Sequence, residues 1–321
     1  MGLEVLLRNY IKFQKKKNKY FLKKGVSESG WCVDSKILSH SIKMLEFANK
    51  SIIRTSVCFG KSYNYYKYNN FKINDNMNRF IIPLSTDYSK FTKSCKFKNQ
   101  IKKKKINFFN WYKTINTKIK KIEKIKPQII SAQFLENLWK KISRIKPLFS
   151  RYRNKKFWEW RYLKCKYYKY QISKCPKNSG VIIFRIEDIK RNSLNEKKYS
   201  IIRIIEILPS NKNIWNKSHD KDFEVFCLGV LKWAQKKGCI AADYHLSSSI
   251  FNKFLFKIGF KLQTSTNKYP ERALAIIFNP IKYDYKPINL AWKININKKF
   301  INNFIPYFVK SDGLGDFPKL T

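Results

Sequence analysis

The chain has 321 residues, 44% of them hydrophobic and 16% aromatic, which is enough apolar material for two domains and too much for a disordered protein. Lys and Arg number 68 against 21 Asp and Glu, a net charge of +47 that first suggests nucleic acid or an anionic membrane surface as a partner. Lys, Asn, Ile, Phe and Tyr are abundant while Arg is scarce, which indicates an AT-rich coding bias. We therefore interpret much of the charge as a solvated coat, and expect only weak, non-specific contact with nucleic acid or anionic membranes.

Targeting signals and metal-binding motifs are not apparent in the sequence. No apolar run approaches the length of a membrane span, and the start at Met1 does not read as a signal peptide, so we expect a cytoplasmic protein. The seven cysteines are scattered without Cys-x-x-Cys spacing, and the three histidines do not cluster with them. We therefore expect no metal site, and predict buried free thiols in a reducing compartment.

Residues 1–92 are interpreted as a first unit. Apolar spacing from Leu3 to Phe13 predicts a helix that ends in a charged run, and Ile37 to Phe47 predicts another. Ser51 to Phe59 indicates a strand, and Phe80 to Leu84 indicates a second strand. The tyrosine-rich segment between them is predicted to form a short helix.

Residues 93–126 differ in composition from the rest of the chain, with 13 lysines, a single acidic residue and a central group of aromatic residues. One interpretation is a basic linker or exposed hairpin whose aromatic side chains dock on a neighbouring domain. The other is a patch that stacks bases or anchors on lipid, because lysines beside aromatic residues suit both partners.

Residues 127–280 are interpreted as a second unit, and residues 281–321 as a C-terminal extension. Ser131 is placed to cap a helix, and an aromatic block follows it at 157–162. Three strands are predicted over Tyr167–Ser173, Gly180–Ile186 and Tyr199–Leu208. Then come a helix from Asp222 to Gly238, a strand Cys239–Tyr244, a helix Ser249–Ile258 and a strand Ala273–Phe278. Alternation of strand and helix late in this unit requires some parallel pairing, and we expect Cys239–Tyr244 to lie parallel to Tyr199–Leu208.

A short pattern occurs twice in the chain. Gly259-Phe260-Lys261 follows the last predicted helix, and Asn70-Phe71-Lys72 follows the tyrosine-rich segment. Each copy predicts a helix that stops on a residue in the left-handed conformation and leads into a strand, since Gly and then Asn tolerate that conformation best. The two copies suggest that the first unit is partly related to the second.

The order of these segments resembles the GNAT acyltransferase superfamily, and more narrowly the GNAT-like proteins associated with surface-polysaccharide gene clusters. The residues that carry the resemblance are Phe157–Leu163, Gly180–Arg185, Arg203–Leu208, Lys257–Phe260, Tyr66-Lys67 with Asn70–Asp75, Asn78–Phe80, and the acidic tail Asp312–Pro318. The resemblance implies an α/β fold of the α+β type, with a mixed sheet flanked by helices. In this fold the sheet splays between two central strands, and the pantetheine arm of acetyl-CoA or another acyl-CoA lies in the split. No metal is implied.

The same resemblance suggests where the chemistry lies. Candidate catalytic residues are Tyr66, Glu206, Asp243 and His245. Candidate cofactor-binding residues are Ile205, Ile207, Leu208 and Ser248, and candidate substrate-binding residues are Trp158, Trp160, Arg161 and Tyr244. The sequence departs from the family at two places: residues 209–216 contain no glycine where a pyrophosphate loop is expected, and Leu255 stands where a leaving-group Tyr is usual.

The function implied is transfer of an acyl group from acyl-CoA to an amine or hydroxyl of a small-molecule or sugar acceptor. Two alternatives stay open: a GNAT-derived scaffold that has lost catalysis, and a basic module for nucleic acid or anionic membranes centred on residues 93–126. The oligomeric state is not indicated by the sequence.

Overall fold

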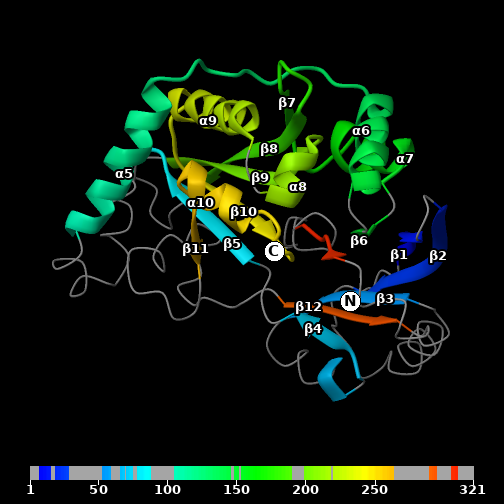
Figure 1. Ribbon diagram of the computed structural model, residues 1–321. Helices are drawn as coiled ribbons and strands as arrows, with labels where there is room; N and C mark the ends of the chain where they lie inside the picture. The colour runs from blue at the N-terminus through cyan, green and yellow to red at the C-terminus, as the bar shows by residue number, and fades with distance from the viewer. Residues whose placement is uncertain are drawn as a thin grey trace.

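The computed structural model describes residues 7–15, 19–28, 53–58, 66–68, 70–74, 78–87, 105–145, 148–151, 153–189, 199–217, 220–263, 289–294 and 305–309. These residues form two mixed β-sheets, and the described helices gather around one of them (Figure 1). This arrangement confirms the expected α/β fold with a mixed sheet flanked by helices.

The six-stranded sheet has the order β11-β5-β10-β9-β8-β7. Its strands are β5 (Asn78–Pro83), β7 (Gln171–Lys174), β8 (Gly180–Ile189), β9 (Tyr199–Pro209), β10 (Cys239–Leu246) and β11 (Lys261–Gln263). Strands β9 and β10 are parallel and are joined by helix α9 (Lys221–Lys236), as the order of strand, long helix and strand predicted. All other pairings in this sheet are antiparallel. Because β5 pairs with both β10 and β11, the expected divisions at residues 92 and 127 are not divisions of this sheet.

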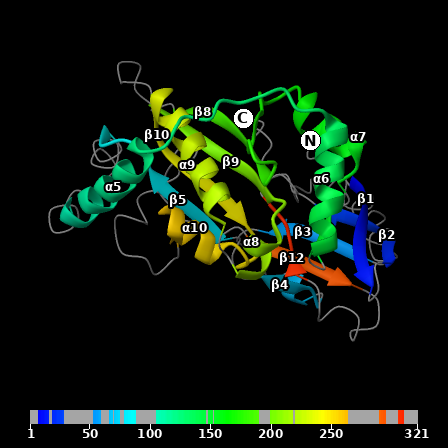
Figure 2. The same cartoon turned by 45° about the horizontal axis from the view of Figure 1, so that its top comes forward.

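Helices cover both faces of the six-stranded sheet. On one face, Phe184 of β8 contacts Trp233 of α9, and α10 (Asn252–Ile258) packs beside α9. On the other lie α6 (Ala132–Ile145), α7 (Lys155–Trp158) and a π-helical turn, η3 (Glu159–Leu163). The short helix α8 (Lys212–Lys217) follows β9. The second view separates α9 from α6 and α7 clearly (Figure 2).

The seven-stranded sheet has the order β13-β6-β1-β2-β3-β12-β4 and unites both ends of the chain. Its strands are β1 (Leu7–Lys15), β2 (Lys19–Glu28), β3 (Ile53–Cys58), β4 (Lys72–Asn74), β6 (Leu148–Arg151), β12 (Asn289–Ile294) and β13 (Ile305–Pro306). The predicted strand over Ser51–Phe59 is confirmed by β3. The predicted helix over Leu3–Phe13 is wrong from Leu7 onward, because β1 pairs along its whole length with β2. A short apolar run can fit both the helical and the strand pattern of apolar residues, and here the pairing with β2 selects the strand.

Residues 105–120 of the segment 93–126 form helix α5 (Lys105–Lys120) and not a hairpin. Trp111, Ile115 and Ile119 repeat at helical spacing and are buried. The indole Nε1 of Trp111 donates a hydrogen bond of 2.8 Å to the carbonyl oxygen of Gly259, at the end of α10. Trp111 is thus an aromatic side chain of this segment that contacts a neighbouring element, and it does so from a helix.

The two copies of the repeated pattern end their helical turns in the same way. Asn70 has φ 57° and Gly259 has φ 118°, so both adopt the predicted left-handed conformation. The amide of Phe71 donates to the carbonyl of Tyr66 over 3.0 Å, and the amide of Phe260 donates to that of Leu255 over 2.9 Å. These bonds span the same number of residues and satisfy carbonyls at the end of the helical turn. Strands β4 and β11 then follow, as predicted.

Two predictions concern the N-terminal ends of α6 and α9, and one of them is confirmed while the other is corrected. The hydroxyl of Ser131 accepts a hydrogen bond of 3.2 Å from the amide of Phe134, which caps α6 as expected. Helix α9 begins earlier than Asp222, because Asp220 is its N-cap and accepts from the amide of Phe223 over 3.0 Å. The predicted elements over 37–47 and 273–278, and the acidic tail 312–318, lie outside the described residues.

Candidate functional site

The parallel strands β9 and β10 separate in the middle of the six-stranded sheet. Their register runs from Ser200 beside Cys239 to Ile204 beside Tyr244 and goes no further. Beyond that point, β9 continues on β8 as far as Pro209, and β10 continues on β5 as far as Leu246. Each strand therefore follows a different neighbour, and the sheet splits as the resemblance implied.

A segment from the C-terminal part of the chain lies at this split, as the red trace beside β10 in Figure 1 shows. Val309 forms an antiparallel bridge with Leu246, and the amide of Ser247 donates to the carbonyl of Phe308 over 2.9 Å. The hydroxyl of Tyr307 lies 3.2 Å from both the carbonyl oxygen of Ile207 and Oε2 of Glu206. Tyr307 thus occupies a backbone acceptor of β9 that β10 leaves available.

Glu206 is the centre of a buried polar cluster at the split. Its Oε1 accepts a hydrogen bond of 2.8 Å from the hydroxyl of Tyr162 and lies 3.1 Å from a guanidinium nitrogen of Arg153. The Arg153 guanidinium stacks 4.4 Å from the ring of Trp139 and 5.2 Å from that of Tyr307. A buried carboxylate needs this kind of pairing, because leaving it without hydrogen bonds or counter-charge is costly.

Two tyrosines at the split keep their protons. Burial, together with the charge of Glu206, raises the pKa of Tyr244 well above its usual value. Burial likewise raises the pKa of Tyr307, with Tyr244 and then Glu206 adding to the effect. Because a phenol ionises near pH 10 even when exposed, both hydroxyls are hydrogen-bond donors at neutral pH.

A β-bulge sets which way Glu206 points. Arg203 of β9 is opposite Arg185 of β8, and Glu206 is opposite Ile183, so one residue on β9 is extra between them. Ile183 and Arg185 share a face of β8, and paired residues point to the same side of a sheet. Arg203 and Glu206 therefore share a face, although their odd spacing would put them on opposite faces of a regular strand.

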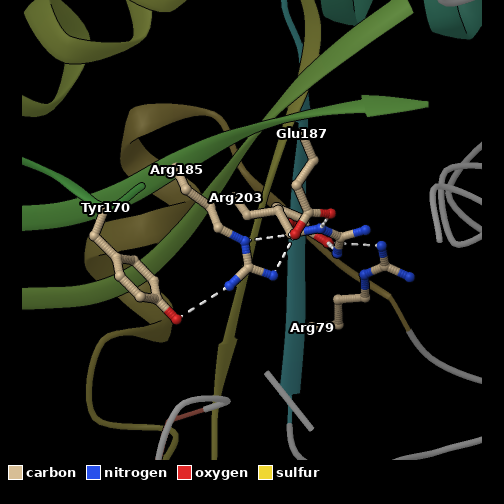
Figure 3. A network of polar contacts seen from close by, with 6 residues as sticks. Arg79, Tyr170, Arg185, Glu187 and Arg203 are labelled. Atoms are coloured by element: carbon tan, nitrogen blue, oxygen red, sulfur yellow. Dashed lines mark hydrogen bonds and ion pairs between the residues drawn. The ribbon is translucent and has the colours of Figure 1, made fainter. Parts of the chain in front are cut away.

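A second buried network lies on the same face, across four neighbouring strands (Figure 3). Oδ2 of Asp243 on β10 lies 2.7 Å from Arg79 of β5 and 3.0 Å from Arg203 of β9. Arg203 also pairs with Glu187 of β8, which in turn pairs with Arg185 of the same strand. Since Phe184 faces α9, its neighbour Arg185 and the rest of this row face away from α9.

The beginning of α9, where a pyrophosphate was expected, carries negative charge. Asp220 caps the helix, and Asp222 and Glu224 lie in its first turn. Lys177 approaches Asp222 to 2.8 Å. These carboxylates already use the positive end of the helix, so they oppose an added anion there.

The predicted catalytic residues are divided among three places. Glu206 stands at the split, while Asp243 and His245 lie in β10, with His245 buried and in register with Arg79. Tyr66 is buried elsewhere and packs edge-on against Phe71 at 4.9 Å between ring centroids, beside β4.

The predicted cofactor and substrate residues are also placed. Ile205, Ile207 and Leu208 are buried in β9 at the split, and the hydroxyl of Ser248 accepts from the amide of Ile250 over 3.2 Å. Tyr244 is at the split, whereas Trp158 is buried and stacked on Tyr162 with 5.6 Å between centroids. Arg161 is buried, and Trp160 is 49% exposed.

Several residues of the site were missed by the sequence interpretation: Arg79, Arg153, Tyr162, Arg185, Glu187, Arg203 and Tyr307. A signal existed for Arg185, Glu187 and Arg203, because charged residues in otherwise apolar strands indicate an inward polar network. Arg153 and Tyr307 carry no such signal, since each reaches Glu206 from a distant part of the chain. In the part of the chain that the structure describes, no group of three or more His, Cys, Asp or Glu side chains is placed to hold a metal ion. Nor is any described helix long and apolar enough to span a bilayer.

No family profile and no curated protein matches the sequence. Among solved structures, the chain is similar to Saccharomyces cerevisiae N-myristoyltransferase with bound myristoyl-CoA, with a TM-score of 0.53 and 9% identity, covering 90% of this chain and 65% of that one. It is also similar to a GCN5-related N-acetyltransferase from Anabaena variabilis, with a TM-score of 0.44 and 9% identity over 91% and 59%. A third likeness is to a probable N-acyltransferase from Enterococcus faecalis, with a TM-score of 0.44 and 8% identity over 94% and 61%.

The likeness to the yeast N-myristoyltransferase extends to nearly the whole chain. At 9% identity it shows the fold alone. The chain spans less than two thirds of the length of each of these proteins. The expected fold, a mixed sheet flanked by helices, is therefore shared with the yeast protein.

Proposed function

We propose that the protein is an acyltransferase that moves an acyl group from acyl-CoA to an amine or a hydroxyl. The observation that carries this proposal is the split between β9 and β10, which leaves the backbone of β9 beyond Ile204 without a partner on β10. Pantetheine is a narrow chain with two amide groups, so it can bond along such an edge as a strand would. The yeast protein of the same fold was solved with myristoyl-CoA bound.

The residues beside the split suit a thioester reaction. The acceptor nitrogen or oxygen attacks the thioester carbonyl, the C–S bond breaks, the acceptor loses a proton and the thiolate gains one. Tyr244 is a protonated phenol there and can donate a hydrogen bond to the thioester. Glu206 positions Tyr307 and Tyr162, with Arg153 as its counter-charge.

The acceptor site is proposed for the same face of the sheet. Asp243 and His245 of β10 stay candidates for receiving the proton of the acceptor, together with Glu206. We keep a sugar of a surface polysaccharide as the proposed acceptor on the strength of the sequence resemblance. Tyr66 is proposed to act in packing, because its place beside Phe71 and β4 belongs to the seven-stranded sheet.

A second function, a scaffold of the same fold without catalysis, is favoured by two observations. Tyr307 bonds to Ile207, where a pantetheine amide would also bond. Carboxylates crowd the start of α9, which disfavours a pyrophosphate there. Both features oppose acyl-CoA binding and are compatible with a stable fold.

Calorimetry of the full chain with acetyl-CoA and with myristoyl-CoA distinguishes the two functions. For the transferase we expect saturable binding of at least one acyl-CoA, and slower amide hydrogen exchange at 205–208 and 246–248 when it is bound. Transfer of a radiolabelled acyl group to a panel of amines and amino sugars then tests the reaction itself.

Free CoA and an acyl-pantetheine without the nucleotide serve as matched ligands. If the acidic start of α9 weakens pyrophosphate binding, the acyl-pantetheine should bind nearly as well as the acyl-CoA. A well-folded protein that binds neither acyl-CoA at millimolar concentration would leave only the scaffold.

A further inference from the structure

Five charged side chains form a continuous row across four strands of the six-stranded sheet (Figure 3). The row runs from Arg185 and Glu187 on β8, through Arg203 on β9 and Asp243 on β10, to Arg79 on β5. Arg185, Arg203 and Asp243 are direct neighbours in strand register. The sheet itself therefore fixes the spacing of these groups.

Stability does not account for a row of this kind. Arg79, Arg185, Arg203 and Asp243 are all buried, and the desolvation of buried charges offsets most of what their pairing returns. Apolar side chains at these positions would serve a sheet core equally well. A costly arrangement of buried charge inside a sheet is a common mark of a functional site.

The charges of the row do not balance. Three guanidinium groups face two carboxylates, so the five side chains together carry one positive charge. Burial, the largest single effect, would lower the pKa of Arg203, but Asp243 and Glu187 outweigh it and hold that pKa above its usual value. The guanidinium of Arg203 therefore stays charged.

Glu187 differs from the other members of the row. Its side chain is 19% exposed, against 3% for Arg185 and for Arg203. One of its carboxylate oxygens contacts Arg185 and the other contacts Arg203, so it bridges the two. The half-buried rings of Tyr168 and Tyr170 lie against Arg185 at this end, with Tyr168 3.7 Å from the guanidinium carbon and the hydroxyl of Tyr170 3.3 Å from Nη1. The row meets solvent where Glu187 lies.

We propose that Arg185 and Arg203 bind a carboxylate of the acceptor, which takes the place of the Glu187 carboxylate. The proposal rests on the proposed acyltransferase function, and it names the acceptor class as an acidic amine or hydroxy compound. A planar carboxylate is favoured over phosphate because Glu187 already presents two oxygens to two guanidiniums. Glu187 moves toward solvent when the ligand binds. The bulge puts Glu206, which lies at the split, on this same face of the sheet.

Calorimetry of the full chain without acyl-CoA tests the proposal. The probes are propionate, its neutral match propionamide, and inorganic phosphate. We expect propionate to bind and propionamide not to. Glu187→Gln keeps the shape of the side chain but removes its competing charge, and should tighten propionate binding at least tenfold. Arg185→Lys should weaken it at least tenfold, because Lys cannot form the planar two-nitrogen contact.

Lys140→Gln is the matched control, since it removes a positive charge from an exposed pair on α6 and should leave propionate binding unchanged. Circular dichroism shows whether each variant folds. Equal binding of propionate and propionamide, binding of phosphate alone, or a folded Glu187→Gln variant that does not bind propionate more tightly would each overturn the proposal. Since acyl-CoA is omitted, these results are independent of the test of the acyltransferase itself.

Discussion

The hydroxyl of Tyr307 lies 3.2 Å from the carbonyl oxygen of Ile207, at the point where β9 has lost its partner on the β10 side. The same hydroxyl lies 3.2 Å from Oε2 of Glu206 and can donate its proton to only one of the two at a time. One phenol therefore links the C-terminal segment, the split in the sheet and the buried carboxylate.

Replacing Tyr307 by Phe should lower the free energy of unfolding by about 1–3 kcal/mol, because it takes a donor from a buried carboxylate and a buried carbonyl while keeping the ring. Urea denaturation measures the loss. Tyr68→Phe is the control, since Tyr68 is 88% exposed and should change stability little. An unchanged midpoint for Tyr307→Phe would mean that the hydroxyl adds nothing to the split.

Two left-handed glycines allow backbone strain to be separated from steric clash. Gly238 has φ +83° with open space where a Cβ would stand, whereas Gly259 has φ +118° and a Cβ there would lie 2.9 Å from Ile115. Gly238→Ala should cost roughly 1–2 kcal/mol from the left-handed conformation alone. Gly259→Ala should cost more, because α5 must also move away from α10. Thermal unfolding compares the two, and equal losses would show that Ile115 yields without cost.

Helices α6, α9 and α10 and strands β7, β8, β9 and β10 could be predicted because local signals agree there: apolar runs of strand length, a Ser cap before α6, and Gly238 and Gly259 after the helices. The N-terminal strand β1 could not, since its identity depends on pairing with β2. The position of β5 between β10 and β11 also depends on contacts across the chain.

The candidate site was predictable only in part. Glu206 was named because it points from a central strand, and Asp243 and Tyr244 were named because they end the strand predicted next to it. Their partners were not, because a bulge is invisible in the sequence and it alone turns Glu206 to the face of Arg203. Arg153 and Tyr307 are brought to Glu206 by the packing of α6 and of the C-terminal segment.

The start of α9 offers a direct comparison of two neighbouring acids. Asp220 is buried and accepts a hydrogen bond from Phe223, whereas Asp222 is exposed and pairs with an exposed lysine, Lys177. Asp220→Ala should lower the free energy of unfolding by about 0.5–2 kcal/mol through loss of the cap. Asp222→Ala should change it little, because exposed ion pairs contribute little. Chemical denaturation tests the order, and a larger loss for Asp222→Ala would contradict the assignment of the cap.

The buried thiols predict how stability changes at alkaline pH. Burial, with a smaller contribution from Asp188, raises the pKa of Cys239 from 9.0 to about 12, and burial also raises the pKa of Cys227 well above 9.0. A raised pKa means that the folded protein favours the neutral thiol. Above about pH 9 the unfolded chain releases this proton while the folded protein keeps it, so stability falls as pH rises toward about 12.

For Cys239 the fall should approach about 1.4 kcal/mol per pH unit within that window. Cys239→Ala should flatten the decline measured by urea unfolding between pH 8 and pH 11, while Cys165→Ala, at a partly exposed position, should leave the slope unchanged. Iodoacetamide offers a second measurement, because the thiolate is the reactive form. In the native protein Cys165 should be alkylated readily and Cys239 only on unfolding, and equal labelling of the two would show that Cys239 is not protected by its strand.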